Sequence, residues 1–238
     1  NVAVGRQALN NNTTGTKNVA IGRSALAANT ASDNTAVGFC AMYSTTTGSN
    51  NTAVGRCALK LNTTGDCNTA LGQNSLDANT SGTRNIAVGG EALGANTTAS
   101  FNNALGYKAL CSNTTGASNV SIGTCSMRIN TTGGENTAVG HTALCANTTG
   151  AGNVSVGNLS LKANTTGASN VAVGGASLDA NTTGNCNTAI GTNSLTTNTT
   201  ADNNTAVGFS ALKVNTTGAA NIAVGTDALR ANTTANFN

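Results

Sequence analysis

Hydrophobic and polar residues recur along this chain with a period of 17 residues. The unit at residues 136–152 is typical: Asn at position 1, Thr-Ala-Val at positions 2–4, Gly at 5, Ala-Leu at 8 and 9, and Asn-Thr-Thr-Gly at 12–15. Repetition on this scale predicts a solenoid in which each unit contacts only its neighbours. The fourteen units, of which the second is one residue short, begin at Asn1, Asn18, Asn34, Asn51, Asn68, Asn85, Asn102, Asn119, Asn136, Asn153, Asn170, Asn187, Asn204 and Asn221.

The unit has the pattern of β structure. β-Branched or aliphatic residues occupy positions 2 and 4 on either side of a small residue, which is the alternation expected of a strand. The glycine at position 5 and the Asn-Thr-Thr-Gly segment favour turns, and a helix would have to accommodate both within every 17 residues. We therefore predict an all-β fold, an elongated parallel β-solenoid of 17-residue coils with two strands per coil, at positions 1–5 and 8–13.

Stacking of the coils at about 4.8 Å places equivalent positions above one another. Position 4 (Val4, Ile21, Val37) and position 9 (Leu9, Leu26, Met42) are predicted to form two apolar ladders inside the coil. The small residues at positions 3 and 8 indicate a close approach, either by the opposite layer of the coil or by a neighbouring chain. We expect one continuous solenoid from residue 1 to residue 238, cut from a longer array.

The Asn-Thr-Thr segment matches the acceptor motif for N-glycosylation. The same residues are also suited to turns and to side-chain ladders along a stack. Stacked glycans along one edge of the solenoid are the functional prediction, and no cofactor is expected apart from such covalent N-linked glycans. The candidate acceptors are the position-12 residues Asn12, Asn62, Asn79, Asn96, Asn113, Asn130, Asn147, Asn164, Asn181, Asn198, Asn215 and Asn232.

The positions of the seven cysteines predict cross-links. Cys40 and Cys57 share position 7 in successive coils, so their Cα atoms lie about 4.8 Å apart, which fits a disulfide. Cys125 lies one coil from Cys111 and from Cys145 and is able to bond only one of them. Cys67 and Cys186 share position 17 seven coils apart, which predicts intermolecular bonds or free thiols. Disulfides and glycosylation motifs together indicate an extracellular or cell-surface location.

Composition offers little chemistry. Charged residues make up 8% of the chain, the net charge is +3, and no apolar run has the ~18 residues of a membrane span. The basic residues Arg6, Arg23, Arg56, Lys60, Lys162 and Lys213 are interpreted as solvated side chains, and no nucleic-acid surface is expected. The single histidine, His141, lies at a variable position and no carboxylate pair repeats. We predict no enzymatic activity, no catalytic residue and no metal site.

The segment Asn18-Val-Ala-Ile-Gly-Arg-Ser-Ala25 resembles the repeats in the heads of YadA-type trimeric autotransporter adhesins. The longer Asn-Thr-Ala-Val-Gly…Asn-Thr-Thr-Gly unit is similar to repeat arrays in surface and tail-fibre proteins of aquatic microbes and viruses. This resemblance implies a parallel β-roll, a trimer, and binding to host or matrix surfaces. It covers the whole chain, although the 17-residue unit, the Asn-Thr-Thr segment and the cysteines depart from the adhesin pattern.

Three functions are consistent with these observations. The first is a structural extracellular fibril that associates with itself end to end or laterally. The second is an adhesin head or a viral tail-fibre shaft, which requires a trimer. The third is ice binding, suggested by the threonine at position 13 of every coil. Because positions 13 and 14 are adjacent, only one of the two threonine ranks is expected to face outward, which weighs against the third function.

Overall fold

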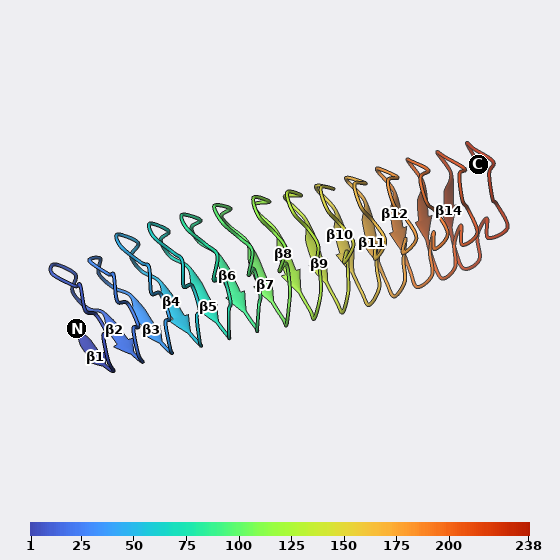
Figure 1. The fold of residues 1–238 in the computed structure, drawn as a ribbon. Coiled ribbons are helices and arrows are strands. Elements are labelled where there is room, and N and C mark those ends of the chain that lie inside the picture. Colours follow the sequence, from blue (N-terminus) through green and yellow to red (C-terminus); the bar gives the residue numbers. More distant parts are fainter. The chain divides into compact units, whose positions relative to one another are not determined.

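The computed structural model describes residues 1–238 and contains fourteen strands of three residues and no helix. Each strand covers positions 2–4 of its coil, and the chain completes one coil between successive strands (Figure 1). The strands are β1 (Val2–Val4), β2 (Val19–Ile21), β3 (Thr35–Val37), β4 (Thr52–Val54), β5 (Thr69–Leu71), β6 (Ile86–Val88), β7 (Asn103–Leu105), β8 (Val120–Ile122), β9 (Thr137–Val139), β10 (Val154–Val156), β11 (Val171–Val173), β12 (Thr188–Ile190), β13 (Thr205–Val207) and β14 (Ile222–Val224).

The chain divides into two compact units of seven coils, Asn1–Ser118 and Asn119–Asn238. The first unit holds β1 to β7 and the second holds β8 to β14. Within each unit, every strand pairs in parallel with the next strand in the sequence, and equivalent positions lie opposite one another, as in Thr35 and Thr52. The predicted all-β parallel solenoid of 17-residue coils is therefore confirmed. That the two units form one continuous solenoid stays a prediction.

The strands turn the opposite face inward from the one that the sequence suggested. The position-3 residue is buried in every coil after the first, as in Ala53 and Ala138, whereas position 4 faces outward, with Val54 39% and Ile190 40% exposed. The prediction of an internal ladder at position 4 is wrong. The interior between the two sides of the coil is narrow, and it accepts a methyl group but not an isopropyl group at this height.

Positions 3 and 8 face each other across that narrow interior. In the two coils where position 3 is serine, position 8 is serine too, and the hydroxyls of Ser155 and Ser160 lie 2.6 Å apart. A hydroxyl inside the coil is thus matched by a second hydroxyl that can satisfy it. The close approach indicated by these small residues is made by the opposite layer of the same coil.

The second predicted strand, at positions 8–13, is absent, and this prediction is wrong. Residues at positions 7 and 9 adopt the left-handed conformation, for example Thr142 with φ 53° and Leu144 with φ 51°. These dihedrals fold the segment into a chain of turns whose amides still bond to the next coil, as from Leu144 N to Ser160 O at 3.0 Å. The position-9 side chain nevertheless points inward and is fully buried in coils 2 to 13, so this ladder is confirmed.

Glycine at position 5 is required where the strand ends. Gly140 has φ +141°, and a Cβ built on it would lie 2.4 Å from the carbonyl oxygen of Gly157 in the next coil. Both the dihedral and the contact exclude a side chain. The same geometry recurs at Gly55 and Gly191, so successive coils lie too close along this edge for a side chain at position 5.

The one shortened coil, residues 18–33, shows which position the stack can lose. Thr30 makes the position-13 hydrogen bond to the carbonyl of Thr46, and the next residue, Ala31, already takes the position-15 role by accepting a hydrogen bond from Asn29 Nδ2. The residue that is missing is therefore the one at position 14.

Candidate functional surfaces

The position-12 asparagines form a ladder inside the coil. Asn147 Nδ2 donates to Asn130 Oδ1 of the preceding coil (2.8 Å) and to the Gly150 carbonyl of its own coil (2.9 Å), and Asn147 Oδ1 accepts from Asn164 Nδ2 (2.9 Å). The side chain is 0% exposed. Because both amide hydrogens and the carbonyl oxygen are used, the ladder is a saturated polar core.

This ladder is incompatible with the predicted glycans. Ten of the twelve candidate acceptors have 0% exposure, and only Asn12 and Asn232, in the two outermost coils, are partly exposed. A sugar on Nδ2 would remove a donor from the ladder and would have to occupy the interior of the coil. The predicted acceptors that are buried in this way are Asn62, Asn79, Asn96, Asn113, Asn130, Asn147, Asn164, Asn181, Asn198 and Asn215.

A second asparagine ladder, at position 1, was not recognised in the sequence. Asn136 Oδ1 accepts the backbone N–H of Asn153 (2.9 Å), and Asn136 Nδ2 donates to the Gly150 carbonyl (2.9 Å). The Gly150 carbonyl therefore receives one amide from each ladder and ties the two together. The sequence shows that asparagine occurs at position 1 of every coil, but it does not show that this asparagine is buried.

The first ladder is interrupted at the third coil. The third coil carries Thr45 at position 12, and its hydroxyl oxygen is buried without a hydrogen-bond partner. A single hydroxyl cannot reproduce the two donors and the acceptor of an asparagine amide. This coil supplies a natural comparison for substitutions elsewhere in the ladder.

No disulfide joins any of the seven cysteines in the structure. Cys40 and Cys57 occupy the same position in neighbouring coils as expected, but the predicted bond between them is not formed, and neither is a bond from Cys125 to Cys111 or Cys145. Cys67 and Cys186 are both exposed at position 17. The cross-links stay predictions for oxidising conditions.

The outer face of the sheet carries a row of aliphatic side chains at position 4. Every coil has Val, Ile or Leu there, and seven of these side chains are exposed, from Ile122 at 38% to Val224 at 70%. No charged residue occurs at positions 1–5 of any coil. We name this row the sheet stripe.

The threonine ranks lie at another edge of the coil. At position 13 the hydroxyl is used inside the stack, as in Thr148 Oγ1, which donates to the carbonyl of Thr165 at 3.0 Å. Position 14 is exposed throughout, and thirteen of the fourteen coils have Thr or Ser there. The single fully outward rank that we expected is therefore the one at position 14.

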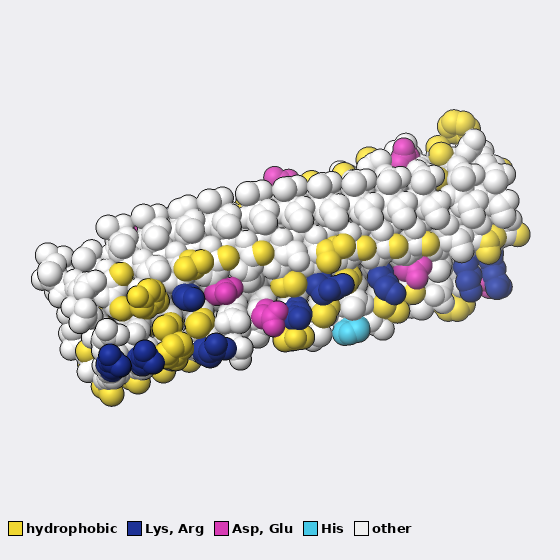
Figure 2. All heavy atoms as spheres, viewed as in Figure 1, with side chains coloured by type: hydrophobic (Ala, Val, Ile, Leu, Met, Phe, Trp, Pro, Cys, Tyr) yellow, Lys and Arg dark blue, Asp and Glu magenta, His cyan; other side chains and the backbone are white.

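Most charged residues occur at positions 6–10 and so lie on one side of the coil. Figure 2 shows Lys and Arg side chains on this side toward the N-terminal end of the first unit, with hydrophobic side chains between them. Arg6, Arg23 and Arg56 share position 6 with Phe39 in coils 1 to 4. Their row is fixed by the backbone, because the carbonyls of Arg6 and Arg23 each accept an N–H from the following coil.

The charges beyond this row are balanced. Glu91 pairs with Lys108 at 3.4 Å, and Arg230 pairs with Asp227 at 3.5 Å. Burial raises the pKa of Asp77, an effect that its own backbone and the charge of Lys60 reduce. Burial likewise raises the pKa of Asp179. No cluster of three or more His, Cys, Asp or Glu side chains capable of holding a metal ion is present.

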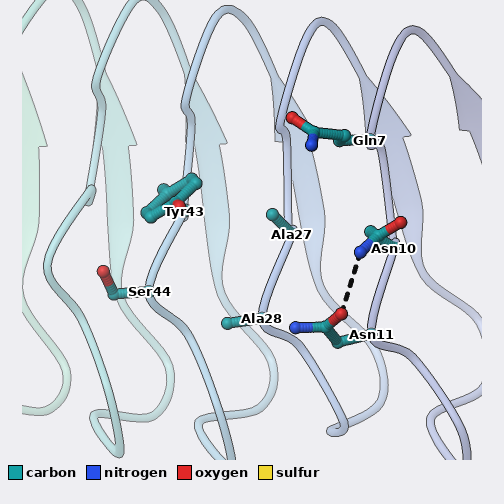
Figure 3. A pocket seen from close by; sticks show the side chains of 7 residues that line it. All are labelled: Gln7, Asn10, Asn11, Ala27, Ala28, Tyr43 and Ser44. Carbon is teal, nitrogen blue, oxygen red and sulfur yellow. Dashed lines mark hydrogen bonds between the residues drawn. The ribbon is translucent and has the colours of Figure 1, made fainter.

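Two shallow pockets lie beside the position-6 row in the first unit. One, of about 350 Å³, is lined by Gln7, Arg23, Ser24, Phe39, Cys40, Tyr43 and Lys60. The other, of about 240 Å³, is lined by Gln7, Asn10, Asn11, Ala27, Ala28, Tyr43 and Ser44 (Figure 3). They share Gln7 and Tyr43, so amide, hydroxyl and phenol groups from three neighbouring coils adjoin the arginine row.

No protein-family model, no curated protein and no solved structure matches this chain. The structure thus shows the β-solenoid, and the likeness to adhesin heads and tail-fibre arrays stays a prediction. None of its segments forms a helix of the length and apolar character needed to cross a bilayer.

Proposed function

We propose that this chain is a structural, non-enzymatic protein of an extracellular or cell-surface fibre, and that copies of it associate laterally through the sheet stripe. The observation that carries the proposal is the exposed aliphatic row at position 4. Contiguous exposed apolar surface of this kind marks interaction sites. The extracellular location rests on the resemblance to surface and adhesin repeats.

The interior of the coil suits a mechanical role. Each coil is joined to the next by backbone hydrogen bonds, by two asparagine ladders and by the position-9 aliphatic ladder. Deforming one coil against its neighbour breaks buried hydrogen bonds, each of which costs about 1–3 kcal/mol when a polar group is left unsatisfied. A stack held in this way resists bending and twisting without any bound cofactor or metal.

The partner on the sheet stripe is a second copy of this chain. A matching surface must offer an uncharged row with one aliphatic side chain every ~4.8 Å, and the stripe itself meets that requirement. Each side chain that is about 40% exposed gains about 1 kcal/mol on burial. In the first unit four of the seven position-4 side chains are exposed to about this extent or more and the other three are half-buried, so the unit supplies about 4–6 kcal/mol per partner, which is within the range that association costs. Longer rows of coils therefore associate more firmly than shorter ones.

The alternative function is the head of an adhesin or the shaft of a viral tail fibre. It shares the solenoid and the self-association, and it differs by requiring a target molecule outside the fibre. The observation that favours it is the row of arginines at position 6 in the first unit.

The experiment measures self-association by sedimentation velocity over a range of protein concentrations. Replacing Ile21 and Val54 with lysine places charges on the sheet stripe, and we expect it to shift the protein toward a monomer. The matched control replaces Thr47 and Thr64, both exposed at position 14, with lysine and retains the association. A wild-type chain that stays monomeric at all concentrations, or equal behaviour of the two variants, refutes lateral association through this face.

A further inference from the structure

We propose that the first four coils bind an anionic polysaccharide, such as a sulfated or uronic-acid-rich chain. The binding region, named here the cationic surface, comprises Arg6, Arg23, Arg56 and Lys60 with the aromatic residues Phe39 and Tyr43 and the two pockets between them. This proposal is independent of the lateral association described above, because the sheet stripe lies on a different side of the coil.

The charges of the chain concentrate in this region. Residues 1–67 contain five Lys or Arg and two Asp, so they carry a net charge of +3, equal to that of the whole chain. The second unit, with four basic and four acidic residues, is neutral. The two acids of the first four coils, Asp33 and Asp66, lie near position 16 rather than in the position-6 row, and Asp33 is 4.0 Å from Lys17.

The basic groups of the cationic surface are available to a ligand. Arg6, Arg23 and Arg56 are exposed and take part in none of the ion pairs of the structure. Their shared position spaces them by one or two coils, about 5 or 10 Å. A linear polyanion lying along the stack would therefore meet one guanidinium after another. Guanidinium groups bind carboxylate and sulfate-like oxyanions with paired hydrogen bonds.

The lining of the pockets favours sugar over nucleobase. Gln7, Asn10, Asn11 and Ser44 offer amide and hydroxyl groups, which both donate and accept hydrogen bonds as sugar hydroxyls do. In Figure 3, Gln7, Asn10 and Asn11 lie on one side of Ala27 and Ala28, and Tyr43 and Ser44 lie on the other, with Asn10 Nδ2 bonded to Asn11 Oδ1 at 2.9 Å. The guanidinium of Arg23 lies over the Phe39 ring, 5.7 Å from its centroid, so this ring face is already covered.

Single-stranded nucleic acid requires open aromatic faces on which successive bases stack. Tyr43, 44% exposed, is the only aromatic side chain of the two pockets not covered by a cation. One free ring suffices for the apolar face of a sugar but not for a run of bases. The arrangement thus favours a polysaccharide.

The test measures fluorescence anisotropy of a labelled heparin-derived decasaccharide titrated with the whole chain at several salt concentrations. The triple substitution Arg6→Gln, Arg23→Gln and Arg56→Gln is expected to weaken binding at least tenfold. It is also expected to reduce the magnitude of the slope of log K against log salt concentration by about 2–3. The matched control, Lys17→Gln with Arg84→Gln and Lys108→Gln, removes three charges from the same unit and is expected to change the affinity less than twofold. Circular dichroism confirms that both variants are folded.

Tyr43→Ala separates the aromatic contribution from the charge. We expect it to weaken decasaccharide binding about threefold or more with no change in the salt dependence. Neutral dextran of equal length is expected not to bind. The proposal is overturned if the two triple variants lose equal affinity for the decasaccharide, or if dextran binds tightly. Tighter binding of a 15-nucleotide poly-dT than of the decasaccharide assigns the surface to nucleic acid instead.

Discussion

Replacing Asn147 with threonine tests whether the position-12 ladder holds the coils together. The change removes three hydrogen bonds, of 2.8 to 2.9 Å, from a side chain with 0% exposure. A threonine hydroxyl has one proton to donate, so either Asn130 Oδ1 or the Gly150 carbonyl loses a donor, and at the equivalent position of the third coil the Thr45 hydroxyl makes no hydrogen bond at all. We expect two or three of the bonds to be lost, which corresponds to a loss of about 3–5 kcal/mol in the free energy of unfolding.

The assay is urea denaturation followed by circular dichroism, combined with amide hydrogen exchange to locate the effect. Since each coil interacts with its neighbours only, we expect faster exchange in the coils around Asn147 and unchanged exchange in the first unit. Asn158→Thr, at an exposed position 6 of the following coil, serves as the control and is expected to stay within about 0.5 kcal/mol of the wild type.

The reverse change probes the same argument in the opposite direction. Thr45→Asn closes the natural gap, where a buried hydroxyl has no partner, and we expect it to raise the free energy of unfolding by about 1–2 kcal/mol. If Asn147→Thr and Asn158→Thr destabilise the protein equally, the ladder does not carry the stability that its geometry implies, and the reasoning fails.

The remaining predictions concern the turn glycines, a half-buried carboxylate and the cysteines. Gly140→Ala, with φ +141° and a Cβ contact of 2.4 Å, is expected to abolish or severely weaken folding, whereas Gly90→Ala, whose Cβ meets nothing nearer than 3.5 Å, is expected to leave the melting temperature nearly unchanged. Because burial raises the pKa of Asp77 in the folded state, its contribution favours folding below its unfolded pKa and is lost as the pH rises through the folded pKa. Asp77→Asn should therefore raise the melting temperature at pH 7 more than at pH 3, and an equal change at both pH values would contradict this. Thiol titration in denaturant should count seven reactive thiols under reducing conditions. If Cys40 and Cys57 form a disulfide, mild oxidation should remove two of them. A Cys40→Ser variant that loses as many thiols on oxidation as the wild type would exclude this pair.

The sequence predicts the solenoid well because the same pattern recurs in all fourteen units. A misinterpreted residue does not change the period of 17 on which the prediction rests. The parallel register follows directly, since equal coil lengths place like residues over like. The position-9 ladder could be predicted for the same reason, because leucine or methionine occurs there in every coil. Burial of a large aliphatic side chain is what a stack with few other apolar groups requires.

Which face of the strand turns inward could not be predicted from the alternation. A period of two is satisfied by either choice, and reversing it moves every side chain to the other face. Because valine is more hydrophobic than alanine, the sequence suggested that position 4 faces the interior. The space between the two sides of the coil is narrow, however, and it holds the smaller alanine at position 3 instead. The turns at positions 7 and 9 gave no signal at all, because leucine is an unusual residue for the left-handed conformation that Leu144 adopts.

The asparagine motif shows the same limit for the candidate sites. A sequon specifies residue types but not exposure, and the amide of Asn96 suits a glycan acceptor and a buried ladder equally well until its burial is known. The cationic surface was missed for a related reason. Arg6, Arg23 and Arg56 are far apart in the sequence and read as scattered, yet one shared position in the repeat brings them into a single row.

The loss of one residue from the coil at residues 18–33 shows that the register of the stack does not depend on position 14. The position-1 asparagine ladder and the position-9 ladder both continue through this coil. A site that accepts a deletion inside an otherwise strict repeat is also a site at which short peptides can be inserted. The coil thus contains a natural attachment point, and epitopes or enzymes inserted between positions 13 and 15 of chosen coils would be displayed at intervals set by the rise of about 4.8 Å.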